Sequence, residues 1–284
     1  MAPIKHRSRI HLLAAKEAPI VVILQRKRAK LFHIITVDTD KHSIEEGSWF
    51  RGVLYALSCD VSFDGKFMVY LARGSDGRTV WTGLCRLPHL KTLVDATGSL
   101  SCGGYFADRK ILKLFGWYHR EKSVHAEIPF KVRRGELRGP HGELSAFYSR
   151  LERDGFTRLG DNWGVEKRLP TRRTYEVACH GDDGWGHRYS PRHPELRVHY
   201  LGYLNSAHTF AYSLDAYPDL LNGASCATWD TDGNLWVARP GLVEQYTLKD
   251  LRHGTQSFSL DVDRFEPPPE REQGPMTGGD AKRL

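Results

Sequence analysis

The chain has 284 residues, of which 40% are apolar and 26% are charged, and its formal net charge is +7. That apolar share is enough to build a core, and the length suits one large domain or two small ones. The charge excess is local, because residues 1–30 hold eight basic residues and one acidic residue. A nucleic-acid-binding domain normally spreads its basic excess over its whole body, so the composition argues against that class.

The N-terminal segment, residues 1–15, is expected to be a short basic arm. Its apolar stretch Ile10–Ala15 has six residues, fewer than the roughly 7–15 of a signal-peptide core. The next apolar run, Ala18–Leu24, has seven residues, whereas a membrane-spanning helix needs about 20. We therefore predict a cytoplasmic protein without a membrane segment.

Two runs rich in β-branched residues, Ile20–Gln25 and Leu31–Val37, follow the arm. The polar segment between them contains Arg26, Lys27 and Arg28. Two such runs joined by a short polar segment are typical of a β-hairpin with an exposed loop. These three basic residues are therefore candidates for binding a partner.

A phrase built around Asp-Gly occurs twice in the chain, at Ser62–Tyr70 and at Asp230–Ala238. In each copy Asp-Gly and one polar residue precede an apolar strand. Asp and Gly favour a tight turn, because Asp bonds its own backbone and Gly accepts a positive φ. A weaker copy without Gly is Asp108–Leu114, 44 residues after Asp64. A period near 40–45 residues with several strands in each unit is typical of β-propellers.

The two stronger copies resemble the repeats of known propeller families. Ser62–Tyr70 looks like the SPDGxxIAF phrase of TolB-type, WD40-like repeats, and Asp230–Ala238 resembles the DGNLWVA phrase of NHL and lactonase-type blades. Residues 120–200 show no clean copy. The resemblance implies a propeller fold but no particular activity, since propellers host both binding modules and enzymes.

We therefore predict an all-β fold, a single β-propeller of five or six blades over residues 16–265. The tail, residues 266–284, is rich in Pro and Gly and is expected to be disordered. In the middle of the chain, Leu144, Phe147, Tyr148 and Leu151 have helical spacing. A hairpin that turns at residues 153–155 is the alternative, and we favour it because it continues the strand–turn rhythm.

The Gly-rich stretch from residue 180 to residue 187 is the most unusual in the chain. Its glycines flank Asp182, Asp183 and Trp185, a composition that disfavours a helix or a central strand. An exposed Trp often anchors a protein partner, so these three residues are candidates for partner binding. The alternative is a hairpin turn whose Trp packs under a neighbouring blade.

Five histidines lie between His180 and His208. Their spacing is neither HxH nor HxxxH, so His180 and His187 are only weak candidates for a metal site. His-rich surface loops are the favoured interpretation. Asp230–Asn234 resembles part of a calcium loop but lacks its distal ligands, which favours a simple turn.

Catalytic motifs are missing from the sequence. It contains no Gly-x-Ser-x-Gly elbow, no phosphate-binding loop and no CxxC pair. The five cysteines are an odd number with wide spacing, so we expect them to be reduced and buried. The sequence therefore predicts no catalytic residue and no cofactor.

Charge is polarised further along the chain. Residues 131–173 hold 11 basic and six acidic residues, whereas residues 176–232 hold eight acidic and three basic ones. Opposite patches on one body suit docking to a protein, although neighbouring blades that neutralise each other are an equal alternative. We predict a non-catalytic interaction module, an adaptor or a regulatory or inhibitory subunit. The alternatives are a propeller hydrolase, glycosidase-like or a metal-dependent lactonase, and nucleic-acid contact through the basic arm.

Overall fold

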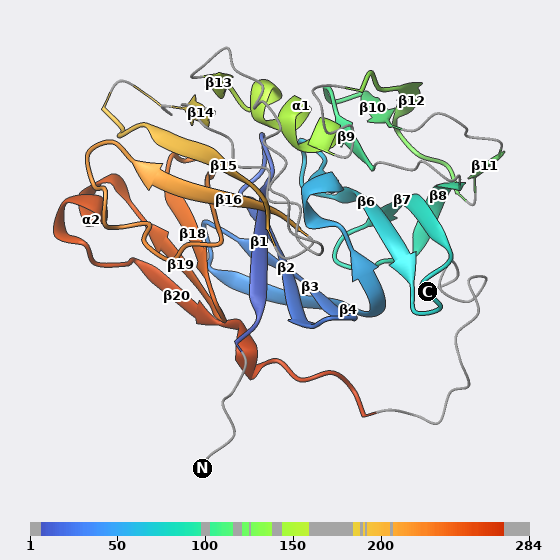
Figure 1. Cartoon of the computed structure of the whole chain (residues 1–284), viewed down its shortest axis with the longest axis horizontal. Helices are drawn as coiled ribbons and strands as arrows, with labels where there is room; N and C mark the ends of the chain where they lie inside the picture. Colours follow the sequence, from blue (N-terminus) through green and yellow to red (C-terminus); the bar gives the residue numbers. More distant parts are fainter. Residues whose placement is uncertain are drawn as a thin grey trace, which may run out of the picture.

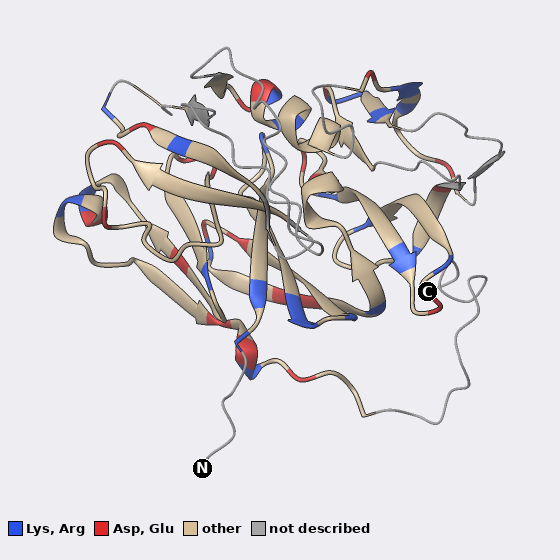
Figure 2. Cartoon of the chain, viewed as in Figure 1, with Lys and Arg blue, Asp and Glu red and all other residues tan. Residues whose placement is uncertain are grey.

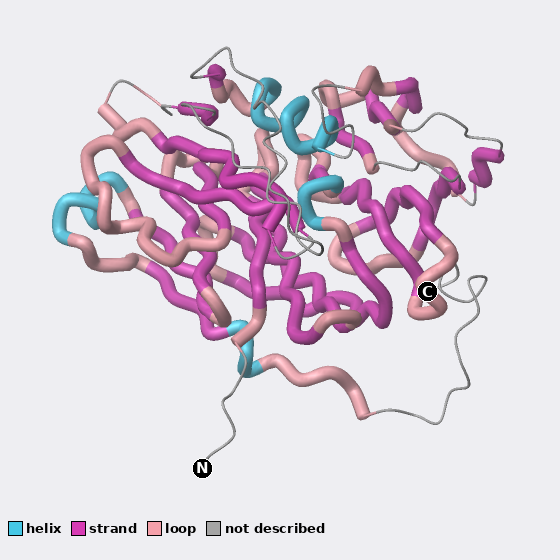
Figure 3. The backbone as a smooth tube through the Cα atoms, viewed as in Figure 1, coloured by secondary structure: helices cyan, strands magenta, loops and turns pink. Residues whose placement is uncertain are grey.

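The computed structural model of the chain describes residues 7–97, 103–115, 121–124, 126–137, 144–158, 184–187, 190, 192–204 and 207–269. Strands dominate these residues, and the helical segments among them are short (Figures 1 and 3). Nearly all strand pairs are antiparallel. The exception is the parallel pair of Ile111–Leu114 with Lys131–Arg134. The predicted all-β class is therefore confirmed.

Four antiparallel strands open the chain and pair in sequence order. They are β1 (Arg9–Ala14), β2 (Ile20–Arg28), β3 (Leu31–Asp38) and β4 (Ser43–Leu54). Strand β1 takes residues 9–14 of the expected arm into the sheet. The predicted hairpin is confirmed, but β2 runs on to Arg28, so the basic residues 26–28 lie at a strand end and only residues 29 and 30 form the turn.

Strand β4 is long, and its last residues pair with β6 in a second group of strands. This group follows the 3-10 helix η1 (Ala56–Ser58) and pairs in the order β6-β7-β8-β11, with β5 alongside β6. Its members are β5 (Asp60–Val61), β6 (Phe67–Gly74), β7 (Val80–Arg86), β8 (Thr92–Thr97) and β11 (Glu121–Val124).

Three smaller sheets follow along the chain. The first contains β9 (Gly104–Phe106), β10 (Ile111–Leu114) and β12 (Lys131–Arg134). The second contains β13 (Thr157–Arg158), β14 (Gly184–His187), β15 (Leu196–Leu204) and β16 (Ala207–Leu214). The third contains β17 (Cys226–Trp229), β18 (Leu235–Arg239), β19 (Leu242–Tyr246) and β20 (Phe258–Asp261), with helix α2 (Leu248–His253) and the 3-10 helix η3 (Val262–Arg264).

Strands β1, β2 and β3 are buried on both faces over most of their length, whereas most of β4 is exposed or partly buried. Leu12 and Ile23 join one apolar cluster with residues of the last two sheets, whereas Leu13 and Val22 join another with residues of β6 and β7. Successive residues of a strand point to opposite faces, so one face of β1 and β2 is covered by the last two sheets and the other by β6 and β7. This arrangement explains why residues 20–24 are apolar without alternation.

The Asp-Gly phrases form the predicted turns. Gly65 and Gly233 have φ values of +71° and +79°, which only Gly adopts without strain. In the first turn the Ser62 hydroxyl accepts from the backbone N–H of Phe67 at 3.0 Å. In the second, Asp230 Oδ1 accepts from the backbone N–H of Asn234 at 2.8 Å. Each turn leads into an apolar strand, β6 or β18, as expected from the sequence.

The favoured hairpin in the middle of the chain is wrong, because the segment forms helix α1 (Ser145–Arg153). Leu144, Phe147 and Leu151 are all buried in the large core cluster, so the helical spacing reflects a real apolar face. The helix ends at Arg153, and the φ of +92° at Gly155 lets the N–H of Phe156 donate back to Leu151 O at 2.9 Å. Burial of that face outweighed the strand rhythm of the surrounding sequence.

The first and last sheets lie side by side. The Ser225 hydroxyl donates to Ile10 O at 2.9 Å, and the backbone N–H of Gly241 donates to Ser8 O at 2.8 Å. The N–H of Ser8 also donates to Asp263 Oδ1 at 3.2 Å. The two ends of the described chain therefore hold each other. Residues 270–284 of the predicted disordered tail lie outside the described part.

Candidate functional site

A chain of alternating charges runs from the core to the surface beside α1. The Arg153 guanidinium donates to both oxygens of Asp60, at 2.5 and 3.2 Å, and to both oxygens of Asp154, at 2.8 and 3.2 Å. Lys16 Nζ then lies 3.6 Å from Asp154 Oδ1. Bidentate pairing of this kind fixes geometry as well as charge. The four side chains Asp60, Arg153, Asp154 and Lys16 form what we call the charge chain.

The inner end of the charge chain is fully buried. Burial raises the pKa of the Asp60 carboxyl, and the guanidiniums of Arg153 and Arg150 oppose that rise. Burial by itself lowers the pKa of Arg153, but Asp60 and Asp154 outweigh it, so the net direction is upward. Arg153 therefore stays charged, and helix α1 is tied to β5 by an ion pair with little access to water.

Arg150, one turn earlier on α1, makes a second buried connection. Its Nη1 donates to Cys59 O at 2.7 Å, and its Nη2 donates to His11 Nε2 at 3.2 Å. Because Nε2 accepts, the proton of the neutral imidazole is on Nδ1. Burial and the neighbouring charge of Arg150 lower the pKa of His11 to about 3. These contacts connect α1 to β1 and to the start of β5.

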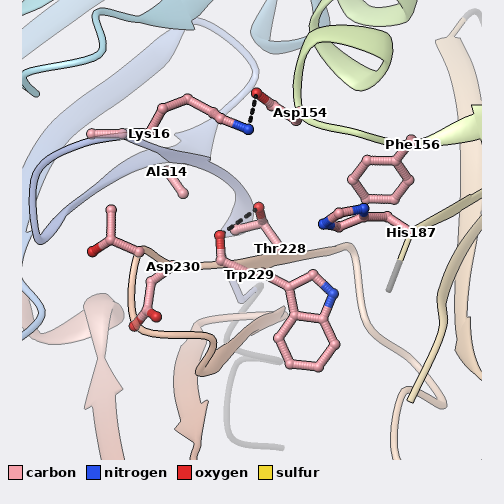
Figure 4. A pocket seen from close by; sticks show the side chains of 10 residues that line it. Ala14, Lys16, Asp154, Phe156, His187, Thr228, Trp229 and Asp230 are labelled. Atoms are coloured by element: carbon pink, nitrogen blue, oxygen red, sulfur yellow. Dashed lines mark hydrogen bonds and ion pairs between the residues drawn. The ribbon is translucent and has the colours of Figure 1, made fainter. Parts of the chain in front are cut away.

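A pocket of about 130 Å³ opens at the outer end of the charge chain (Figure 4). Residues from four separate segments line it: the end of β1 with the two residues that follow, the residues after α1, β14, and the end of β17 with its following turn. A cavity of about 150 Å³ holds a benzene ring, so the space suits one ligand of the size of a single small ring. We call it the central pocket; its lining residues are Ala14, Ala15, Lys16, Asp154, Phe156, His187, Thr228, Trp229, Asp230 and Thr231.

His187 presents a hydrogen-bond acceptor to the central pocket. Its Nδ1 lies 3.1 Å from the carbonyl oxygen of Gly155. A carbonyl only accepts, so Nδ1 carries the proton and Nε2 keeps its lone pair in the neutral ring. Burial, helped by the charge of Lys16, lowers the pKa of His187, while the Gly155 carbonyl and Asp154 oppose that shift. The ring is therefore neutral at neutral pH.

Asp230 lines the central pocket but its carboxylate has a structural role. Oδ1 accepts from the backbone N–H groups of Asp232 and Asn234, at 2.9 and 2.8 Å. Oδ2 accepts from the indole N–H of Trp236 at 2.8 Å and from side-chain amides of Asn234 and Gln245. The favoured interpretation of residues 230–234 as a turn is confirmed. Five donors occupy the Asp230 carboxylate, whereas Asp154 accepts two hydrogen bonds, both from Arg153, and keeps more acceptor capacity for a ligand.

Several cations gather where β1 begins and β2 ends (Figure 2). The central pocket lies at the other end of β1. Arg9 and Arg26 are directly opposite each other in the strand register, and Arg28 ends β2. Burial and the charge of Arg9 lower the pKa of Arg26. Within the described part of the chain, none of the three forms an ion pair with a carboxylate. We call Arg9, Arg26 and Arg28 the basic edge.

Lys27 does not belong to the basic edge, because its side chain points to the other face of the sheet. Its Nζ donates to Asp263 O at 3.3 Å and to Phe265 O, and it lies 2.8 Å from Glu266 Oε1. The ammonium is also 5.9 Å from the centre of the Trp49 ring. Lys27 thus attaches the C-terminal segment to the first sheet. Of the three predicted basic residues, Arg26 and Arg28 remain on the basic edge.

The other predicted site residues are only partly within the described chain. His180, Asp182 and Asp183 lie outside it. The backbone of Trp185 is in β14, between β13 and β15, so the expectation that this stretch avoids a central strand is wrong for residues 184–187.

The described histidines of the His-rich region have separate partners. His193 bonds Ser190 at 2.7 Å, and His199 bonds Ser213 at 3.0 Å. His208 bonds the Tyr200 hydroxyl at 2.8 Å. No three His, Cys, Asp or Glu side chains of the described residues are grouped closely enough to share a metal ion.

Three of the five cysteines, Cys59, Cys85 and Cys226, are buried free thiols, as predicted. Burial raises the pKa of Cys59 to about 12, so this thiol stays protonated. The other two lie outside the described residues. Of the helices within the described part, none combines the length and the apolar character needed to cross a membrane.

Sequence reasoning missed the central pocket entirely. Lys16, Asp154 and His187 come from segments more than 30 residues apart, and no local motif connects them. The available signal was Asp154-Gly155, which was interpreted as the turn of a hairpin and in fact ends α1. Comparison with protein families, with curated proteins and with solved structures finds no match to this chain.

Proposed function

We propose that the chain is a non-catalytic propeller-type interaction module that recruits an acidic protein segment to its basic edge. The propeller is supported by the four mainly antiparallel sheets and by the contact between the first and the last sheet. Burial of β1, β2 and β3 on both faces also fits blades that pack against each other. If the nine-stranded sheet is divided at β4, the strands form five groups, and we propose that each group is one blade.

One observation carries the choice of partner: two arginines face each other across β1 and β2. Like charges directly opposite on neighbouring strands destabilise a sheet, and nothing in the described fold neutralises Arg9 or Arg26. A bound carboxylate removes that cost and gains bidentate hydrogen bonds from a guanidinium. The Arg26 guanidinium is already held 5.9 Å from the Phe32 ring, so less side-chain entropy is lost on binding.

The arrangement favours a protein partner over nucleic acid. Lys27 is engaged with the C-terminal segment, which leaves the basic edge with three guanidiniums and no continuous track of charge. A phosphate backbone needs several cations spaced along a groove. A short acidic peptide needs only the two or three contacts that the basic edge offers.

Binding of a fluorescein-labelled peptide of ten Glu residues tests this proposal. Fluorescence anisotropy at low salt is expected to show saturable binding that is at least tenfold weaker in the Arg9→Gln/Arg28→Gln variant. The matched control is Lys66→Gln/Arg78→Gln, which removes two exposed cations at other turns. It is expected to bind like the parent protein.

Two outcomes count against the proposal. An equal loss of peptide binding in the control and in the basic-edge variant shows that the affinity depends only on the net charge of the protein. Tighter binding of a ten-nucleotide poly-dT strand than of the peptide, with the same residue dependence, favours nucleic acid as the ligand.

A further inference from the structure

The central pocket is separate from the basic edge, and its chemistry is complementary to a different kind of ligand. We propose that it binds a small uncharged molecule with several hydroxyl groups, of about the size of a monosaccharide. The proposal goes beyond the interaction surface proposed above and does not depend on it.

Charge balance is the first argument. The charge chain alternates in sign from Asp60 through Arg153 and Asp154 to Lys16, so its four formal charges cancel. An anionic ligand meets the carboxylate of Asp154, and a cationic ligand meets the ammonium of Lys16. Neither has a counterion in the pocket that is not already paired, and leaving a charge without a partner at a partly desolvated site is costly. A neutral ligand avoids this cost.

Hydrogen-bond complementarity is the second argument. Lys16 Nζ is a donor, and its contact with Asp154 at 3.6 Å is longer than a hydrogen bond. His187 Nε2 is an acceptor, because Nδ1 carries the proton. Both side chains face the same space (Figure 4). A hydroxyl group accepts from an ammonium and donates to an imidazole nitrogen or a carboxylate, so adjacent hydroxyls on one small ring satisfy all three groups together.

The apolar part of the lining is the third argument. Trp229 and Phe156 form walls of the pocket, and they are 7% and 8% exposed. These rings offer a narrow apolar surface beside the polar groups. A ligand with hydroxyls on its rim and C–H groups on its face matches this mixture. The Lys16–Asp154 pair and the His187–Gly155 bond hold the polar groups before the ligand arrives, which reduces the entropy lost on binding.

Ligand-detected NMR with three probes tests the proposal. Saturation-transfer spectra are recorded for D-glucose and ethanolamine, and phosphorus line widths for inorganic phosphate, with the full chain at neutral pH. We expect a saturable signal for D-glucose and none for the two ions. Lys16→Met and His187→Ala, each verified as folded by circular dichroism, are expected to weaken D-glucose binding at least tenfold.

Two controls separate this result from other causes. Lys66→Met removes another exposed lysine that lies 3.7 Å from a carboxylate and is expected to bind D-glucose like the parent protein. The basic-edge variant Arg9→Gln/Arg28→Gln is also expected to retain it, which separates this proposal from the interaction surface. Preferential binding of phosphate or ethanolamine, no binding of any probe, or unchanged D-glucose binding in both pocket variants would overturn the proposal.

Discussion

At the centre of the molecule the guanidinium of Arg153 donates to two carboxylates, whereas at the basic edge Arg9 and Arg26 face each other across two strands. The first arrangement uses a buried cation to hold α1 against β5. The second leaves an exposed Arg9 beside a partly buried Arg26, and neither forms an ion pair with a carboxylate of the described residues. The comparison teaches that the pairing of a charge, rather than its residue type, separates structural arginines from those available to a partner.

The largest expected effect comes from breaking the central pair. Arg153→Met leaves Asp60 buried without its counterion, and removing one partner of a buried ion pair typically costs about 3–5 kcal/mol. Urea unfolding followed by tryptophan fluorescence measures the change. The double variant Arg153→Met/Asp60→Leu is expected to recover part of the loss because Asp60 no longer leaves a buried carboxylate without its counterion. A loss below about 1 kcal/mol in the single variant would contradict a structural role.

Low pH is expected to reduce the free energy of unfolding through His11, which contacts Arg150 of α1. Burial and Arg150 lower the pKa of His11 to about 3 in the folded protein, whereas in the unfolded chain it titrates near 6.5. The unfolded chain therefore gains a proton first as the pH falls below 6.5, and stability is lost between that pH and 3. At pH 4 the loss amounts to about 3 kcal/mol.

Unfolding temperatures measured across this pH range check the prediction. His11→Gln keeps an acceptor for Arg150 but does not titrate, so its profile is expected to be flatter than that of the parent. His33 contributes in the same direction, since burial and the nearby Lys27 lower its pKa to about 4. Identical profiles for the parent and His11→Gln would refute the assignment to His11.

Lys27 tests the comparison further. It is next to Arg26 and Arg28 in the sequence, but its ammonium is bound to the C-terminal segment. Lys27→Met removes its bonds to the C-terminal segment, and we expect a loss of about 1–2 kcal/mol in urea unfolding. Hydrogen exchange of residues 262–266 is expected to accelerate in the variant. Binding of the Glu peptide is expected to stay within twofold of the parent. A large loss of peptide binding would place Lys27 with Arg9 and Arg28 instead.

The smallest expected effect has the opposite sign. Arg9→Gln removes one of two facing like charges, and it is expected to raise the free energy of unfolding by about 0.5 kcal/mol. The gain is expected to shrink in 1 M salt, where charge repulsion is screened. A destabilisation of 1 kcal/mol or more would show that Arg9 has a structural contact comparable to that of Arg153.

Local features of the fold could be predicted from the sequence, because neighbouring residues determine them. The β2–β3 hairpin and the turns at Gly65 and Gly233 follow from short-range patterns of apolar residues and Asp-Gly pairs. Helix α1 was predicted as a hairpin, although its spacing was visible. The spacing alone did not reveal that its apolar face joins one core cluster with residues of the first sheet and of the last two sheets.

The candidate sites depend on contacts between distant residues. Arg153 pairs with Asp60 across 93 positions of sequence, and Lys16 meets Asp154 only because α1 ends beside β1. A single sequence contains no local mark of such pairs. The basic residues 26–28 were recognised as a group, but the sequence could not show that β2 extends through them and turns Lys27 to the opposite face.

The central claim is that the arginines of the basic edge serve a partner while those beside α1 serve the fold. Thermal unfolding with and without a saturating Glu peptide tests it most directly, because a ligand that binds the folded state raises its unfolding temperature. The account predicts that the peptide raises the unfolding temperature of the parent and of Lys66→Gln/Arg78→Gln, but leaves that of Arg9→Gln/Arg28→Gln unchanged. An equal rise in all three proteins would contradict it.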